Sequence, residues 1–174
     1  MAIRFVAQAR AIVRQAEKEA AEAGAPAIEA EHMLLAMAGE HGIEARDVLA
    51  SAGLDRDAIR TALDREFRQS LAAAGVTLPP GGLPMAGRDP NRRARMATSG
   101  KLVLERALKA AAGRGQIQPG HLLLGVLAAQ AGTVPRALAL AGVDQGDLAA
   151  RTRQALAPSH PEELSLPSGH PAAG

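Results

Sequence analysis

Two histidines in nearly identical surroundings are the first residues to consider for chemistry. His32 lies in the segment AEHMLLAM and His121 lies in PGHLLLGV, 89 positions further along (121 − 32 = 89). Histidines one helical turn apart can hold zinc, as in a His-Glu-x-x-His motif, but no such motif occurs here, and His41 is nine residues from His32 (41 − 32 = 9). We therefore expect each histidine to form a hydrogen bond near a helix start, and we expect no metal site.

Glu31, directly before His32, is a second candidate for a binding role. A carboxylate at this place could contact a binding partner, or it could only complement the positive end of the helix dipole. In the second segment Gly120 takes the corresponding position, so only the first segment offers a carboxylate.

Catalytic chemistry finds little support in the sequence. The chain has no cysteine, which excludes thiolate nucleophiles, thiolate metal sites and disulfides. Its serines Ser51, Ser70 and Ser99 stand in no nucleophile-elbow motif. The fragment nearest to a Walker A loop is SGKL, with Arg95 in place of the first glycine and Leu102 in place of the hydroxyl residue. We therefore expect no enzyme, no nucleotide site and no cofactor.

A basic cluster lies in the middle of the chain, at Arg88, Arg92, Arg93 and Arg95. It could contact nucleic acid, or it could be a solvated linker. Aromatic residues make up only 1% of the chain, so none accompanies the arginines for base stacking. The pattern favours a solvated linker, with nucleic-acid contact as the alternative.

The elements that position these residues are expected to be helices. Hydrophobic residues make up 47% of the chain, and they are mainly alanine and leucine, which favour helices. Residues that favour strands are sparse, so an all-α fold without a sheet is expected. No apolar run approaches the ~20 residues of a membrane span. The N-terminal segment lacks the uninterrupted apolar core of a secretory signal, so a cytoplasmic location without membrane contact is expected.

An internal repeat organises the helices. Apolar residues at steps of 4, 3, 4 and 4 run from Phe5 to Ala20 and again from Met96 to Ala111, and LASAGLD at residues 49–55 matches LALAGVD at residues 138–144. Gly53 and Gly142 are expected to end helices, and the aspartates that follow are expected to cap the next ones. The expected helices span 3–23, 30–39, 44–51, 56–73, 98–112, 119–129, 135–141 and 146–156.

These helices predict two pseudo-symmetric four-helix repeats packed into one eight-helix domain. Repeat one would span residues 1–75 and repeat two residues 98–156, joined by a linker at 76–97. Residues 157–174 contain four prolines and few apolar residues, and they are expected to form a disordered tail.

This ordered double set of motifs resembles the Clp repeat domain, the N-terminal domain of the ClpA and ClpC unfoldases, over about residues 1–156. The matching positions in repeat one are Arg4-Phe5, Ala9-Arg10, Val13, Ile28, Glu31-His32-Met33-Leu34-Leu35 and Gly53. Those in repeat two are Lys101, Val103-Leu104-Glu105, Ile117, His121-Leu122-Leu123-Leu124-Gly125 and Gly142.

The resemblance implies a non-catalytic module of the Clp protease and unfoldase system that binds proteins. Because the P-loop motif is missing, the chain resembles a free-standing copy of the domain, lacking the ATPase modules. Its expected role is that of an adaptor, a competitor or a ligand sink. The expected partners are Clp unfoldase subunits, adaptors or substrate proteins.

The resemblance also implies two classes of small ligand. In ClpC-type members paired glutamates help to bind phosphoarginine, and Glu31 matches one of them. Some ClpC domains bind cyclic peptides in a groove between the first helices of the two repeats, and sequestration of such peptides is an alternative function. The expected partner- and ligand-binding residues are Arg4, Phe5, Val13, Glu31, Met96, Lys101 and Glu105. Phe5 and Met96 occupy equivalent places, and a role in the core is their alternative.

Overall fold

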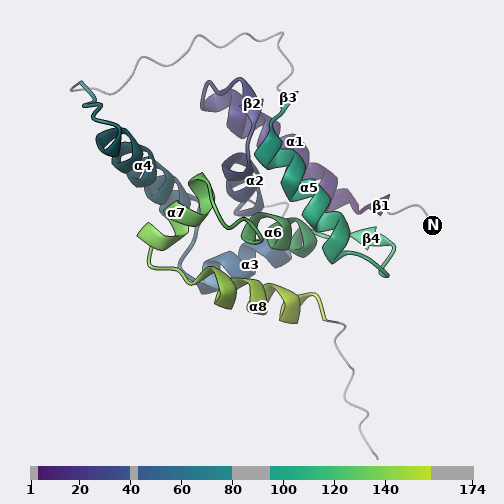
Figure 1. Cartoon of the computed structure of the whole chain (residues 1–174). Coiled ribbons are helices and arrows are strands. Elements are labelled where there is room, and N and C mark those ends of the chain that lie inside the picture. The colour runs from purple at the N-terminus through teal and green to yellow at the C-terminus, as the bar shows by residue number, and fades with distance from the viewer. Residues whose placement is uncertain (1–3, 40–42, 80–94, 158–174) are drawn as a thin grey trace, which may run out of the picture.

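The computed structural model describes residues 4–39, 43–79 and 95–157, and these residues form eight helices (Figure 1). The helices are α1 (Ala7–Glu22), α2 (Ala30–Met37), α3 (Ile43–Ser51), α4 (Arg56–Ala73), α5 (Thr98–Ala110), α6 (Pro119–Leu127), α7 (Thr133–Leu140) and α8 (Gln145–Ala155). The all-α fold class is thus confirmed. None of the described helices is both long enough and apolar enough to cross a membrane. The expected tail, most of the linker and His41 lie outside the described residues.

Four strands of two residues each depart from the expectation of no sheet. They are β1 (Arg4–Phe5), β2 (Ala27–Ile28), β3 (Arg95–Met96) and β4 (Gln116–Ile117), and they pair in parallel as β1–β4 and β2–β3. The amide of Val6 donates to the carbonyl of Ile117 at 3.0 Å, and that of Ala97 donates to Ile28 at 3.0 Å. The expectation of a helix from residue 3 is therefore wrong, because residues 4–5 pair with a distant strand instead.

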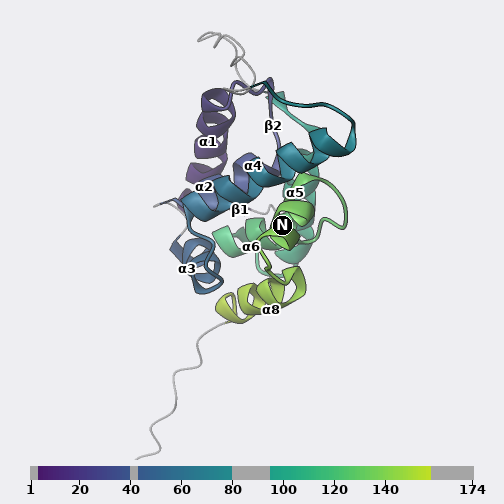
Figure 2. The same ribbon diagram turned by 90° about the vertical axis from the view of Figure 1, so that its left-hand side faces the viewer.

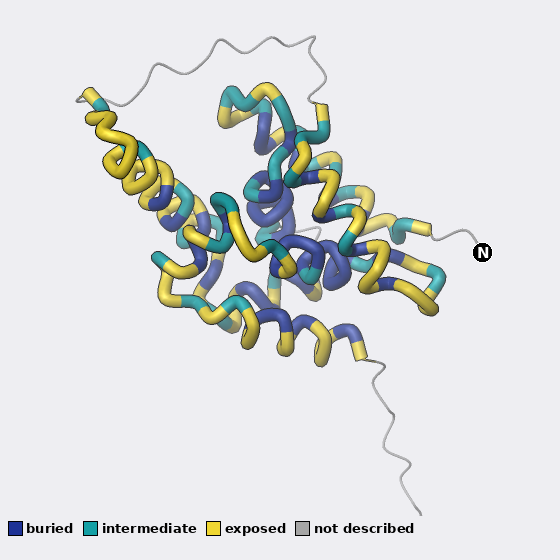
Figure 3. Tube along the Cα trace, viewed as in Figure 1, coloured by how far each residue is buried: buried dark blue, intermediate teal, exposed yellow. Residues whose placement is uncertain are grey.

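The core is built around α2 and α6, which lie at the centre of the molecule in Figure 1. Met33, Leu34, Leu122 and Leu123 are almost fully buried, as expected for helices that are apolar on nearly every side. Helix α1 packs on α2, and α5 packs on α6. Figure 3 shows the same central helices as the most buried part of the chain.

The outer helices connect the two repeats in a reciprocal way. In the repeat order, α3 corresponds to α7 and α4 corresponds to α8. Helix α3 packs on α8, and α4 packs on α7. When each helix is replaced by its counterpart in the other repeat, the first contact becomes the second. The strand pairs exchange in the same way, because each joins the opening strand of one repeat to the second strand of the other. The opening strand of repeat two is β3, which lies within the span 76–97 expected for the linker. The reciprocal contacts form the pseudo-two-fold arrangement that the duplicated sequence predicted.

The turns that precede α4 and α8 follow the expected chemistry. Gly53 and Gly142 have φ values of 72° and 71°, which a residue with a side chain rarely adopts. The carboxylates of Asp55 and Asp144 then accept hydrogen bonds from the amides of Ala58 and Asp147, at 2.8 Å and 2.6 Å.

Candidate ligand-binding pockets around Glu31

Both histidines hold the start of a central helix. The amide of Glu29 donates to Nδ1 of His32 at 2.9 Å, and the amide of Gln118 donates to Nδ1 of His121 at 3.0 Å. The expected helix-start role is therefore confirmed. Within the described ranges, no group of three or more His, Cys, Asp or Glu residues could hold a metal ion.

The two imidazoles must be neutral at Nδ1 in order to accept these bonds. Burial lowers the pKa of His32 below its ordinary value, although the carboxylates of Glu29 and Glu19 oppose the shift. Burial also lowers the pKa of His121, and the nearby charge of Arg114 lowers it further.

Glu31 lies in the first turn of α2, half-buried between two pockets. Burial raises the pKa of its carboxyl group above the ordinary value, and the charges of Glu29 and Glu66 add to the rise, whereas a backbone hydrogen bond partly offsets it. No cationic side chain lies within ion-pair distance of Glu31 in the described part of the chain. The carboxylate is thus available to an incoming cation.

The first of these pockets, here called the Ser99 pocket, has a volume of about 360 Å³. It lies between the start of α2, helix α5 and the segment that leads into α7. The hydroxyl of Ser99 accepts a hydrogen bond from the amide of Ala30 at 3.0 Å and donates one to the carboxylate of Glu29. Arg106, half-buried on α5, lines the same pocket and contributes a cation. The Ser99 pocket therefore combines a carboxylate, a guanidinium group and the start of a helix.

The second pocket, here called the Phe67 groove, has a volume of about 540 Å³ and lies between α1, α2 and α4. Figure 2 shows α4 crossing in front of the molecule at this place. The apolar side chains of Leu35, Leu63 and Phe67 line the groove. The remaining lining is mostly acidic, with one basic side chain: Glu19, Glu22, Glu31, Asp64, Glu66 and Arg60.

Two of the acidic groups in this groove have structural partners. Glu19 is buried and pairs with Arg56 at 2.7 Å and with Arg60 at 3.7 Å. Glu66, only 4% exposed, accepts hydrogen bonds from Ser70 and from Arg136, each at 2.6 Å. Burial alone would raise the pKa of Glu66, but these two hydrogen bonds and the charge of Arg136 outweigh it and lower the pKa. These two carboxylates therefore hold α4 against α1 and α7.

The position in repeat two that corresponds to Glu31 is closed. Gly120 is buried, and a Cβ atom added there would lie 2.8 Å from Cγ of Leu156. The guanidinium of Arg114 donates to the carbonyl of Leu156 and so fixes the end of α8 in this place. A leucine side chain thus lies where repeat one has a carboxylate between two pockets.

The other six candidate residues line neither of these pockets. Phe5 and Val13 are half-buried against the core, and Arg4 is exposed on β1. Met96 also packs on the core, and its sulfur lies 2.5 Å from where a Cβ atom on Gly100 would be.

Lys101 and Glu105 are exposed on α5, where Glu105 pairs with Lys109 at 3.0 Å. Helices α1 and α5 appear on opposite sides of the molecule in Figure 2. A groove between these two helices therefore stays a prediction.

The sequence did not identify Ser99, Arg106 and Phe67 as residues that line these pockets. The available signal for Phe67 was spacing, because Leu63, Phe67 and Leu71 recur at four-residue steps beside the buried row of α4. No comparable signal pointed to Ser99, which reaches α2 only through the packing of the two repeats.

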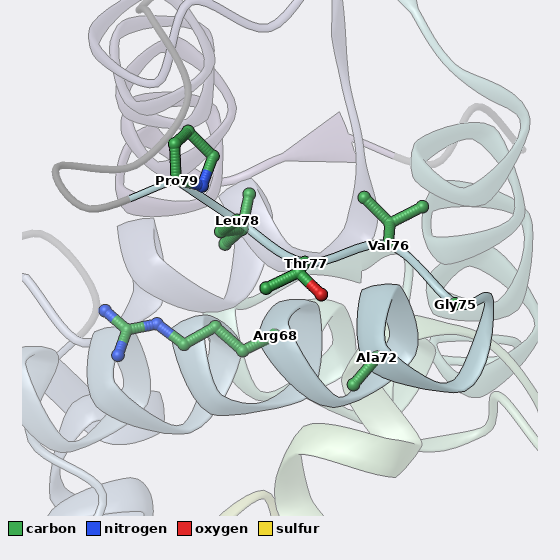
Figure 4. Close-up of a pocket in the computed structure, with 7 residues that line it drawn as sticks. All are labelled: Arg68, Ala72, Gly75, Val76, Thr77, Leu78 and Pro79. Atoms are coloured by element: carbon green, nitrogen blue, oxygen red, sulfur yellow. The ribbon is translucent and has the colours of Figure 1, made fainter.

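A further pocket of about 540 Å³ follows the end of α4 (Figure 4). Val76, Thr77 and Leu78 run back beside Arg68 and Ala72. This pocket is formed by α4 and the segment directly after it, and it contains none of the candidate residues.

The described residues form a double-repeat helical domain with two pockets that meet at Glu31. Residues 4–85 match the family model described as the Clp repeat (R) N-terminal domain. The resemblance to the Clp repeat domain inferred from the sequence is therefore confirmed by this match.

Solved structures with a similar fold also match this chain. The N-terminal domain of the chaperone ClpD from Arabidopsis thaliana has a TM-score of 0.60 and 19% identity, covering 88% of this chain and 94% of that one. The Hsp104 N-terminal domain from Candida albicans has a TM-score of 0.62 and 17% identity, covering 88% and 92%. A structure described as part of a malarial protein secretion system has a TM-score of 0.61 and 15% identity, covering 87% and 93%. At these identities the likeness shows the fold alone.

No curated protein matches the sequence. Clp N-terminal domains are in general protein-interaction modules of Clp chaperones. The specific role of this chain is therefore argued from its own pockets.

Proposed function

We propose that this chain is a non-catalytic protein-binding module of the Clp protease and unfoldase system, acting as an adaptor, a competitor or a ligand sink. The observation that carries the proposal is a Clp-type domain whose first central helix opens into two pockets at Glu31. Its expected partners are Clp unfoldase subunits, adaptors or substrate proteins.

Affinity capture of Clp subunits tests this role. The full chain is immobilised, incubated with an extract of its host, and the bound proteins are quantified by mass spectrometry. We expect Clp unfoldase subunits, adaptors or known Clp substrates to be enriched over a control column. Enrichment of nucleic acid instead would favour the basic-linker alternative, and capture of neither would contradict the proposal.

A finer part of the proposal concerns phosphoarginine in the Ser99 pocket. This ligand needs a carboxylate facing its guanidinium group and a donor facing its phosphate. Glu31 and Arg106 line one pocket and supply both kinds of group. Since Leu156 covers the corresponding position in repeat two, we expect one binding site and not two.

Titration with free phosphoarginine, followed by backbone amide shifts, tests this site. A hydrogen bond to a charged group contributes about 1.5–3 kcal/mol, so Glu31→Gln should weaken binding by roughly ten-fold or more. Glu44→Gln is the matched control, because Glu44 is also an acidic residue in the first turn of a helix, α3. Two sites of equal affinity, or binding untouched by Glu31→Gln, would contradict this part of the proposal.

A further inference from the structure

Helix α4 carries an apolar row that its own fold covers only in part. Ile59, Ala62 and Glu66 face the core and are buried. Leu63, Phe67 and Leu71 form a neighbouring row at four-residue spacing, and Phe67 is 48% exposed. Figure 3 shows the C-terminal half of α4 as mainly exposed.

Leu63 and Phe67 of this row line the Phe67 groove together with acidic side chains of α1, α2 and α4. Leu35 of α2 extends the apolar lining that Leu63 and Phe67 provide. Glu22 lies at the end of α1, and Glu31 lies at the start of α2. A ligand in this groove would therefore meet apolar and acidic side chains together.

The charges of the groove are only partly neutralised within the described residues. Arg60 is the one arginine or lysine in the lining, and it lies near Glu19 and Glu22, at 3.7 Å and 3.9 Å. Asp64, like Glu31, has no cationic side chain within ion-pair distance in the described ranges. Lining acids thus outnumber lining bases, which favours a basic ligand.

We propose that the Phe67 groove docks a short basic segment of a partner protein, one that presents a single bulky apolar side chain flanked by arginine or lysine. The apolar side chain contacts Leu35, Leu63 and Phe67. The flanking basic side chains face Asp64 and Glu31, and a guanidinium group can also lie over the exposed ring of Phe67. This inference rests on the proposed function as a protein-binding module, and it names the surface and the chemistry of the partner.

Fluorescence anisotropy with the full chain tests the groove. The probe is a labelled peptide with one leucine between two pairs of arginines. Its controls replace the leucine by alanine or the arginines by glutamates. We expect the parent peptide to bind and both control peptides to bind at least about ten-fold more weakly, because the anchor and the charges act together. Equal binding of the alanine peptide would overturn the proposal.

Variants of the protein locate the site. Phe67→Ala should weaken binding by about ten-fold, whereas Phe67→Leu should retain most of it. Leu108→Ala, at a 38% exposed leucine on α5, is the matched control and should bind like the parent.

Asp64→Asn should weaken binding and reduce its salt dependence, whereas Asp57→Asn on the same helix should not. Unchanged thermal melting would show that the half-exposed Phe67 can be replaced without unfolding.

The outcomes distinguish this proposal from the broader one. Binding unaffected by Phe67→Ala, or sedimentation showing a Phe67-dependent dimer of this chain, would overturn the basic-segment proposal alone. Phe67-dependent peptide binding without any capture of Clp components would support the groove and contradict the proposed function. Glu31 lines both pockets, so Glu31→Gln should weaken the binding of both phosphoarginine and the peptide. Phe67 lines only the Phe67 groove, so loss of peptide binding in Phe67→Ala with phosphoarginine binding retained would separate the two pockets.

Discussion

At the scale of single residues, the repeated histidine has a structural cause. In each repeat the histidine is the third residue of a central helix, and its imidazole accepts a hydrogen bond from the amide of the residue before the helix. The two bonds measure 2.9 Å and 3.0 Å. Such a bond satisfies a backbone donor that the helix itself leaves without a partner. The apolar residues after the histidine fill the core, so one short phrase supplies both a helix start and a buried helix.

Protonation of these histidines should destabilise the fold. The pKa values of His32 and His121 are lowered in the folded state, so the unfolded chain binds protons more readily near its ordinary histidine pKa of about 6.5. The free energy of unfolding should therefore be fully retained above about pH 7 and should fall as the pH drops below about 6.5. Urea unfolding at several pH values measures this, and His121→Gln should flatten the dependence.

Glu31 provides the control of opposite sign. Its pKa is raised in the folded state, so its contribution to stability is present at low pH and is lost as the pH rises through the raised pKa. Glu31→Gln should remove this loss on raising the pH, and it should leave the loss caused by protonation of the histidines in place. A His121→Gln variant with the same pH dependence as the parent would contradict the histidine account.

At the scale of the elements, the helices were predictable where local signals set their ends. The expected span 56–73 coincides with α4, because Asp55 caps its start and the periodic apolar row fixes its type. The start of α1 was misplaced because Arg4 and Phe5 pair with residues that are distant in sequence, and no local pattern announces this. Ser99 was not identified as a pocket-lining residue for the same reason, whereas Glu31 was identified as a candidate because it lies within the repeated phrase.

The close contact of α5 with α6 depends on a glycine. A Cβ atom on Gly125 would lie 2.3 Å from the carbonyl oxygen of Val103, so the two helices would have to move apart. Gly125→Ala should therefore lower the free energy of unfolding by roughly 2–3 kcal/mol despite the better helix propensity of alanine. Chemical denaturation measures the change.

Gly120→Ala is the matched comparison on the same helix. The added atom would meet the end of the Leu156 side chain, which can change rotamer, rather than a fixed carbonyl group. We expect a loss below about 1 kcal/mol there, since the leucine can adapt. Equal losses at the two glycines would show that the backbone contact does not set the spacing of the helices.

At the scale of the whole molecule, the repeats hold each other together. Both strand pairs and the contacts of α3 with α8 and of α4 with α7 cross from one repeat to the other. Chains cut between residues 79 and 95 should therefore melt at lower temperature than the intact chain, because each half exposes apolar surface that the other half covers. Halves that each melt at the temperature of the intact chain would contradict this.

The absence of a P-loop motif leads to a prediction about nucleotides. The fragment SGKL lies within α5, with Gly100 buried in that helix and not in a loop that could surround phosphates. Calorimetric titration with ATP should show no binding, and phosphate release should equal that of buffer. Saturable ATP binding would contradict the non-catalytic role.

The pairing of β1 with β4 limits when repeat one can complete its fold during synthesis. The amide of Arg4 donates a hydrogen bond to the carbonyl of Gly115. Strand β1 therefore cannot pair until more than a hundred further residues have been synthesised. A growing chain that has reached only the end of α4 has no partner for β1 or for β2. Contacts so distant in sequence slow folding, because a long loop must close before they form. Repeat one can form helices while it emerges from the ribosome, but its strands can pair only after repeat two has been synthesised.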